Sequence, residues 1–183
     1  MSTIYEKYKM EVVAEMKKSL NLGNLLQVPK IEKVVVNVGI GKFIKDSTLV
    51  ADVFNSLKNI TGQKPVMTKA KQSIAGFKTR KGLEIGIKVT LRGKRKWDFL
   101  EKLVKVSIPR IRDFHGIKIM SVDKGGNLNL GIKEQLIFPE ISPEQVKTVF
   151  GMQINVVTDA GSQERGLMLF RLIGFPIEKK DKR

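Results

Sequence analysis

The sequence contains no cysteine and a single histidine, His115. Without cysteine, the chain cannot form a disulfide framework, a zinc knuckle or a thiol nucleophile. One histidine argues against a transition-metal site or a histidine-based triad. Acidic residues such as Glu84, Asp98, Glu101 and Asp113 lie scattered among cations and form no evident acid–base pair. We therefore expect no catalytic centre, no metal site and no cofactor.

Long apolar runs are missing as well. No stretch of about 18 apolar residues could span a membrane, and the first residues, MSTIYEKYKM, lack the apolar core of a signal peptide. Asn59-Ile60-Thr61 fits a glycosylation acceptor, but no other feature suggests secretion. We expect a cytoplasmic protein, or one from an organelle with its own ribosomes.

Charge is what the chain has in excess. It carries 34 Lys and Arg against 18 Asp and Glu, a net charge of +16. Residues 58–118 hold 17 of the basic and 4 of the acidic residues, a net of +13. So much like charge favours a polyanionic partner, with nucleic acid first and an anionic lipid surface second. The lipid alternative is weaker because no amphipathic helix has one strongly basic face.

Length and hydrophobic periodicity predict the organisation of the chain. The 183 residues, 42% of them hydrophobic, suit one domain over residues 1–183 with a frayed basic tail from about 179. Apolar spacing and capping residues predict helices, and alternation predicts strands. The expected helices cover residues 4–22, with Gly23 as the cap, and residues 94–106, 143–150 and 162–173, and a further helix begins at Asp46-Ser47 and ends at Gly62. The expected strands cover residues 31–38, 65–69, 85–92, 127–133 and 154–159.

The strand pattern predicts an α+β fold, a single antiparallel-rich sheet with helices packed on one face and an open basic and polar face for RNA. Apolar residues alternate with Lys33 and Asn37 in one strand and with Lys88, Thr90 and Arg92 in another. Such side chains suit phosphates and sugar hydroxyls. Any half-solvated sheet alternates in this way, so the charge of residues 58–118 is what favours RNA.

A glycine-rich turn, Gly39-Ile40-Gly41-Lys42, follows a predicted strand and invites a nucleotide-binding interpretation. A phosphate loop would need glycine where Val36 stands and Ser or Thr where Phe43 stands. We interpret the segment as a tight turn. The same failure argues against a nucleotide-dependent RNA-modifying enzyme, the main alternative class.

Two basic clusters remain. Residues 69–82 form a Lys-, Gly- and Ser-rich loop with one aromatic, Phe77, which could stack on RNA or fold back onto the core. Residues 92–96, RGKRK, open a predicted helix, where cations oppose the helix dipole and an external anion would explain them. The aromatics do not form the paired motif of an RNA-recognition module, which favours recognition of shape and backbone.

Six stretches resemble, in order and over nearly the whole chain, one known family. They are Lys33–Gly39 (KVVVNVG), Thr61–Lys69 (TGQKPVMTK), Lys71–Lys78 (KQSIAGFK), Lys88–Gly93 (KVTLRG), Pro109–Phe114 (PRIRDF) and Glu134–Ile141 (EQLIFPEI). The family is the bacterial type of the large-subunit ribosomal protein that binds 5S rRNA, the fifth in the traditional numbering.

The resemblance implies a structural, non-catalytic constituent of the large ribosomal subunit. Such proteins bind 5S rRNA and help to attach it in the central protuberance. Their further partners would be large-subunit rRNA, P-site tRNA, a small-subunit head protein in an intersubunit bridge, and neighbouring large-subunit proteins. No membrane and no small-molecule substrate is expected.

The resemblance also implies which residues bind. Its 5S-binding surface falls on Asn37, Gln63, Lys64, Thr68, Lys69 and Thr90, and the polar strand faces and basic loop add Lys33, Lys71, Lys88 and Arg92. Its tRNA-facing loop falls on Ser73 to Lys81, with Ser73, Gly76, Phe77, Lys78, Thr79, Arg80 and Lys81 as candidates. Gln72 and His115 depart from the family, because basic residues are common at both positions.

Overall fold

The computed structural model describes residues 3–178, apart from residues 45, 78, 143 and 145. The expected frayed tail from residue 179 lies outside the described residues. No helix in the described ranges combines the length and the apolar character that crossing a membrane would need.

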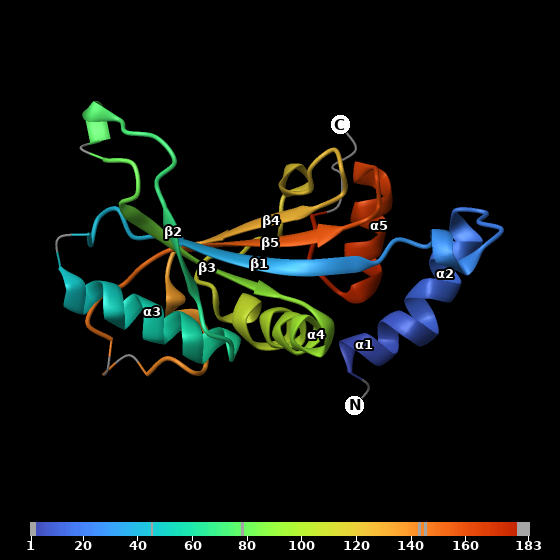
Figure 1. Cartoon of the computed structure of the whole chain (residues 1–183). Helices are drawn as coiled ribbons and strands as arrows, with labels where there is room; N and C mark the ends of the chain where they lie inside the picture. Colours follow the sequence, from blue (N-terminus) through green and yellow to red (C-terminus); the bar gives the residue numbers. More distant parts are fainter. Residues whose placement is uncertain (1–2, 45, 78, 143, 145, 179–183) are drawn as a thin grey trace. The chain divides into compact units, whose positions relative to one another are not determined.

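Five strands form one sheet in the order β2-β3-β1-β5-β4 (Figure 1). Strands β2 and β3 pair antiparallel as a hairpin. With the helices, this sheet confirms the predicted α+β class. The strands are β1 (Ile31–Gly39), β2 (Val66–Lys69), β3 (Glu84–Leu91), β4 (Leu128–Ile132) and β5 (Met152–Thr158).

Apart from the helix predicted over residues 143–150, the helices follow the predicted order, most of them with shifted bounds. Helices α1 (Ile4–Lys7) and α2 (Val13–Ser19) are joined by a π-helical segment, and α4 (Gly93–Lys102) continues into π- and 3₁₀-helical turns as far as Arg110. The others are α3 (Ser47–Thr61) and α5 (Gln163–Ile173), with short 3₁₀ turns at Leu25–Gln27, Ala75–Phe77, Ile119–Ser121 and Gln135–Ile137.

The chain groups into two compact units. Unit 1 comprises residues 1–34, 92–130 and 155–183, and unit 2 comprises residues 35–91 and 131–154. Strands β1, β4 and β5 each have residues in both units. That residues 1–183 form one domain stays a prediction, and each unit is described by itself below.

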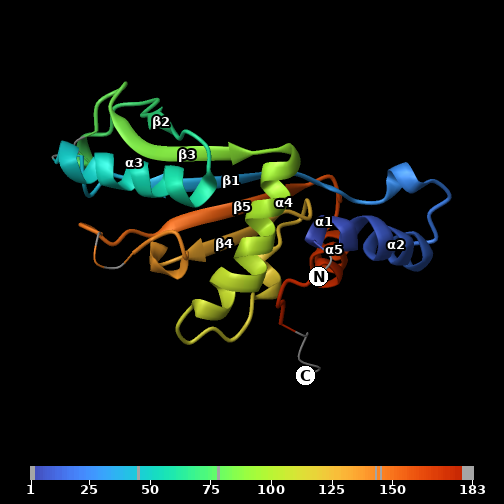
Figure 2. The ribbon, with the colours of Figure 1, turned by 90° about the horizontal axis from the view of Figure 1, so that it is seen from below.

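Helix α3 of unit 2 shows why the capping signals were informative. The Asp46 carboxylate accepts hydrogen bonds from the backbone N–H groups of Thr48 and Leu49, at 2.9 and 3.3 Å, and Gly62 ends the helix at a φ of 62°. Its buried side includes Val53 and Leu57, both 0% exposed. Figures 1 and 2 show α3 on one side of β2 and β3, which leaves the other side uncovered by this helix.

The first helix ends earlier than predicted, because Gly23 is not its cap. Asn21 adopts the left-handed conformation instead, with a φ of 48°. The Leu22 N–H donates to the Lys17 carbonyl at 3.0 Å, the long-range bond of a Schellman motif. Asparagine tolerates this conformation better than most residues, so the helix stops at Ser19.

The predicted helix over residues 143–150 is wrong for 146–150, which the structure describes without helix, whereas 143 and 145 lie outside the described residues. The side chain of Gln135, 0% exposed, provides other hydrogen-bond partners here. Its amide nitrogen donates to the Thr148 carbonyl at 2.7 Å, and its oxygen accepts from the Phe150 N–H at 2.8 Å. Backbone groups satisfied in this way do not need a helix.

Candidate nucleic-acid interface

The polar face of unit 2 comprises Asn37, Thr68, Gly86, Lys88 and Thr90, on strands β1, β2 and β3. Thr68 lies opposite Gly86 in the β2–β3 register, and the next residue on the same side of β3 is Lys88. The intervening residues of β3 are buried and hold the strand on the core, with Ile87, Val89 and Leu91 at most 2% exposed. The predicted division of these strands into an apolar and a polar side is thus confirmed for β3 from Ile87 onward.

Gly86 allows the polar side chains of its neighbours to converge. A Cβ atom added there would lie 2.7 Å from Thr68 Oγ1, 3.2 Å from the Val38 carbonyl oxygen and 4.0 Å from Asn37 Oδ1. The hydroxyl of β2 and the amide of β1 therefore both lie within 4 Å of the position that a side chain of residue 86 would occupy. This juxtaposition offers hydrogen-bonding groups and a close approach to backbone, which suit a sugar–phosphate chain.

The N-terminal end of β3 departs from the predicted strict alternation. Ile85, expected on the apolar side, is 36% exposed. The β2–β3 register shifts between Thr68 and Lys69, so that Lys69 pairs with Glu84. Such a bulge turns the strand locally and displaces one residue from the apolar side.

Gln63 and Lys64 follow α3 directly, and the structure gives them different environments. The Gln63 side-chain amide donates to the Thr90 carbonyl oxygen at 3.1 Å, which ties the end of α3 to β3. Lys64 is exposed. Gln63 thus supports the polar face structurally, a role for which the sequence carried no signal.

The candidate cations are divided between the units. Lys64, Lys69, Lys71 and Lys88 are exposed in unit 2, together with the polar face. Lys33 and Arg92 belong to unit 1, where Lys33 is half-buried in β1 and Arg92 is exposed as the N-cap residue of α4. Eight of the ten predicted rRNA-binding residues therefore belong to unit 2.

The basic loop is a closed hairpin, Ala70–Leu83. The Ala70 N–H donates to the Leu83 carbonyl at 2.8 Å, and Ile74 and Thr79 exchange two backbone hydrogen bonds of 2.9 and 3.1 Å. The Ser73 hydroxyl accepts from the Lys81 N–H at 2.9 Å. Figure 1 shows this hairpin projecting from the β2–β3 end on the side opposite α3.

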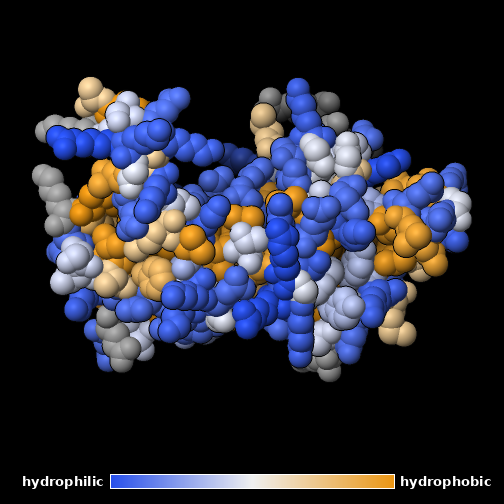
Figure 3. All heavy atoms as spheres, in the orientation of Figure 1, coloured by the Kyte–Doolittle hydropathy of each residue, from blue (hydrophilic) through white to orange (hydrophobic). Residues whose placement is uncertain are grey.

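The candidate residues of the hairpin have the exposure that contact with a partner needs. Ser73, Gly76, Arg80 and Lys81 are exposed and Thr79 is half-buried. Hydrophilic side chains extend from the hairpin at the upper left of Figure 3. Lys78 and the Phe77 side chain lie outside the described part, so the choice between a stacking and a folded-back Phe77 stays a prediction.

The polar side chains of Asn127, which precedes β4, and Asn129 of β4 form hydrogen bonds within unit 1. The Asn127 side chain accepts from the Thr158 N–H at 2.9 Å and donates to the Asp123 carboxylate. Asn155 donates to the side-chain oxygen of Asn129. Polar side chains alternate with apolar ones here too, but their amides already bond within the protein.

Metal-ligating side chains do not gather anywhere in the described residues. Several individual side chains have shifted pKa values. Hydrogen bonds from Thr48 and Leu49 lower the pKa of Asp46, those from Asn127 lower the pKa of Asp123, and burial lowers the pKa of Lys96. None of these shifts creates a pair of opposed acid and base groups.

Comparison with protein families matches both parts of the chain. Residues 24–80 match the family described as ribosomal protein L5, and residues 84–177 match the C-terminus of the same ribosomal family. The second match alone spans more than half of the 183 residues. The two matched regions contain all of the predicted rRNA-binding and tRNA-proximal positions except Lys81, which lies between them. The chain belongs to the ribosomal protein L5 family and is a structural, rRNA-binding constituent of the large ribosomal subunit.

Proposed function

We propose that the polar face of unit 2 binds 5S rRNA and helps to attach it in the central protuberance. The convergence of Thr68 and Asn37 over Gly86 carries this proposal, with exposed Lys64, Lys69 and Lys88 in the same unit. Neutral hydrogen-bonding groups fix the position of an RNA backbone, and cations supply the electrostatic part of the affinity.

The hairpin Ala70–Leu83 is proposed to contact P-site tRNA. It projects on the side opposite α3, exposes Arg80 and Lys81, and is held in shape by its own backbone bonds (Figure 1). A small-subunit head protein and neighbouring large-subunit proteins complete the proposed partners. In this proposal the protein acts without a cofactor and without catalysis, in the ribosome of the cytoplasm.

The 5S proposal is tested by replacing Asn37 and Thr90 together with alanine. Affinity for 5S rRNA in a filter-binding assay should fall by roughly 1–3 kcal/mol, because each change removes a net hydrogen bond to the RNA. Stability should change little, since the Asn37 side chain is exposed and Gln63 bonds to the backbone of Thr90, not to its side chain.

A matched control replaces Asn55 and Asn59 with alanine. Both are exposed on α3, on the helix-covered side of the strands. The control should retain 5S affinity. If the Asn37 and Thr90 variant binds as tightly as the wild type, the polar face is not the 5S site.

A further inference from the structure

Unit 1 contains a groove between its N-terminal helix and α4. Its volume is about 600 Å³, and Tyr5 and Tyr8 form one wall while Lys30 and Ile31 form the floor. Figures 1 and 2 both place α1 beside α4. All residues that line the groove belong to unit 1, whereas the polar face proposed to bind 5S rRNA belongs to unit 2.

The opposite wall is one face of α4. Lys94, Trp97, Asp98 and Glu101 stand at positions i, i+3, i+4 and i+7 of the helix, the spacing of a single face. Trp97 contacts both tyrosines, with ring centroids 5.4 Å from Tyr5 and 5.1 Å from Tyr8. Tyr5 is still 41% exposed, whereas Trp97 is 8% exposed. The walls therefore present a continuous aromatic surface in which Tyr5 is the most exposed ring.

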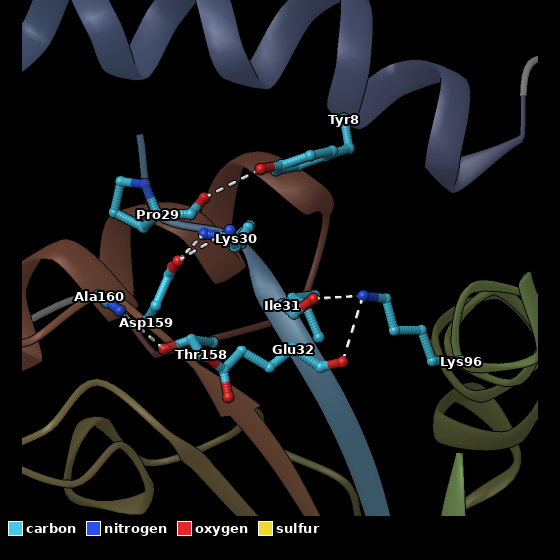
Figure 4. Close-up of polar contacts among 9 residues, drawn as sticks. All are labelled: Tyr8, Pro29, Lys30, Ile31, Glu32, Lys96, Thr158, Asp159 and Ala160. Carbon is cyan, nitrogen blue, oxygen red and sulfur yellow. Dashed lines mark hydrogen bonds and ion pairs between the residues drawn. The ribbon is translucent and has the colours of Figure 1, made fainter. Parts of the chain in front are cut away.

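A polar network fixes the floor of the groove (Figure 4). The Tyr8 hydroxyl donates to the Pro29 carbonyl at 3.1 Å, and the Lys30 N–H donates to the Asp159 carboxylate at 2.6 Å. From α4, the Lys96 ammonium donates to the carbonyl oxygen of Ile31. These bonds join the N-terminal helix, α4 and the start of β1, so the groove is built into the packing of the unit.

Two of the protein's own cations lie over the aromatic rings beside the groove. The Lys9 ammonium lies 4.5 Å from the centre of the Tyr5 ring, and that of Lys96 lies 5.4 Å from the Trp97 ring. Because the rings already attract the protein's own cations, a cationic ligand is disfavoured. Lys94 is exposed in the first turn of α4, where its charge opposes the helix dipole and an anion would relieve the conflict.

One carboxylate gives the groove a preference among ligands. Glu101 pairs with Lys105 at 2.6 Å, whereas among the described residues Asp98 has no ion-pair partner. An exposed carboxylate next to an aromatic wall accepts hydrogen bonds from the amino group of a base such as cytosine. Uracil has a carbonyl oxygen in place of that amino group, so the only donor it can offer to Asp98 is the ring N3–H.

We infer that this groove binds an unpaired RNA nucleotide, with its base against Tyr5, its phosphate near Lys94 and an amino edge toward Asp98. Aromatic side chains with neighbouring cations are the usual means of holding single-stranded RNA. This is a second RNA contact, beyond the polar face of unit 2.

The test is a titration of the full chain with fluorescently labelled oligocytidylate and oligouridylate RNA, read by anisotropy. Changing Tyr5→Leu should weaken oligocytidylate binding about tenfold through lost stacking, and Tyr5→Phe should stay within about twofold because the ring is kept. Lys94→Gln should weaken binding and lower the salt slope by about one, unlike the matched control Lys18→Gln on α2. The wild type should prefer oligocytidylate about fivefold or more, and Asp98→Asn should reduce that preference.

Ultraviolet crosslinking of oligocytidylate to the chain should mark Tyr5 or Trp97. Equal binding by the two Tyr5 variants, or crosslinks confined to the hairpin Ala70–Leu83, would overturn the inference. So would a crosslink from Tyr5 to protein rather than RNA in assembled large subunits. The Asn37 and Thr90 double variant should keep its oligonucleotide affinity while losing 5S affinity. The two proposals can therefore fail separately.

Discussion

Among single residues, Gly86 has the most direct effect on the polar face. Replacing it with alanine brings a Cβ atom within 2.7 Å of Thr68 Oγ1 and 3.2 Å of the Val38 carbonyl oxygen. Overpacking of this kind costs about 1–3 kcal/mol, because a side chain or the backbone must shift. Urea unfolding of Gly86→Ala should show this loss, and 5S rRNA affinity should fall with the displacement of Thr68.

Gly131→Ala is the matched control for that change. Gly131 also lies in a strand of unit 2, and an added Cβ there would meet no atom within 4 Å. Its stability should stay equal or rise slightly, since alanine loses less backbone entropy than glycine on folding. Adding Thr68→Ala to Gly86→Ala should restore part of the lost stability. If Gly86→Ala and Gly131→Ala have the same stability, the close approach of atoms at Gly86 does not affect folding.

Tyr8 provides a pH-dependent signal at the residue scale. Burial, with a smaller contribution from the Asp159 charge, raises its pKa from 10.0 to about 12. A raised pKa means that the folded state holds the proton more tightly than the unfolded state. The associated stability is therefore complete below pH 10 and is lost as pH rises toward about 12.

The measurement is an absorbance titration of phenolate formation, for which the chain has only two tyrosines. Tyr8→Phe should remove the transition near pH 12. Asp159→Asn should lower the Tyr8 pKa only in part, because burial is the larger cause. A wild-type titration that is complete well below that pH would contradict the burial of this hydroxyl.

At the scale of elements, a deletion in the hairpin Ala70–Leu83 distinguishes 5S rRNA binding from contact with P-site tRNA, which net charge alone does not distinguish. Deleting residues 76–80 leaves β2, β3 and the polar face in place. Affinity for 5S rRNA should then stay within about a factor of three, because the sheet keeps its backbone contacts. Retention of P-site tRNA on assembled ribosomes should fall, through lost phosphate contacts of Arg80 and its neighbours.

Ser73→Ala is a useful companion to the deletion. It removes the acceptor for the Lys81 N–H without removing any cation. Retention of tRNA should fall less than in the deletion, because only the shape of the hairpin is loosened. A tenfold or larger loss of 5S affinity in the deletion, with tRNA occupancy unchanged, would make the hairpin part of the 5S site instead.

For the whole molecule, the net charge of +16 should dominate the response to salt. If about four to six phosphates are neutralised, raising salt from about 50 to 200 mM should lower 5S affinity by roughly two to three decades. A log–log plot of affinity against salt concentration measures this directly. A slope near zero would point to a base-reading pocket instead of backbone recognition.

Local signals predicted much of the fold. Asp46 and Gly62 cap α3, as their positions in the sequence indicated, and Ser162 caps α5. The two wrong helix predictions have different causes, one within the last turn of the helix and one between residues distant in the chain. Asn21 takes the left-handed position expected of Gly23, and the buried Gln135 side chain bonds to the backbone of residues 148–150.

The sequence by itself determined the α+β class, the basic character and the polar side of β3, because these depend on residues two to four positions apart and on composition. Only the tertiary structure decided which polar groups meet. Thr68 and Asn37 converge on Gly86, and Gln63 reaches Thr90 across 27 positions. Tyr5 and Trp97, 92 positions apart in the chain, bring the two walls of the groove into contact. Such contacts depend on strand register and helix packing, which no local spacing encodes, because the same alternation is compatible with many registers.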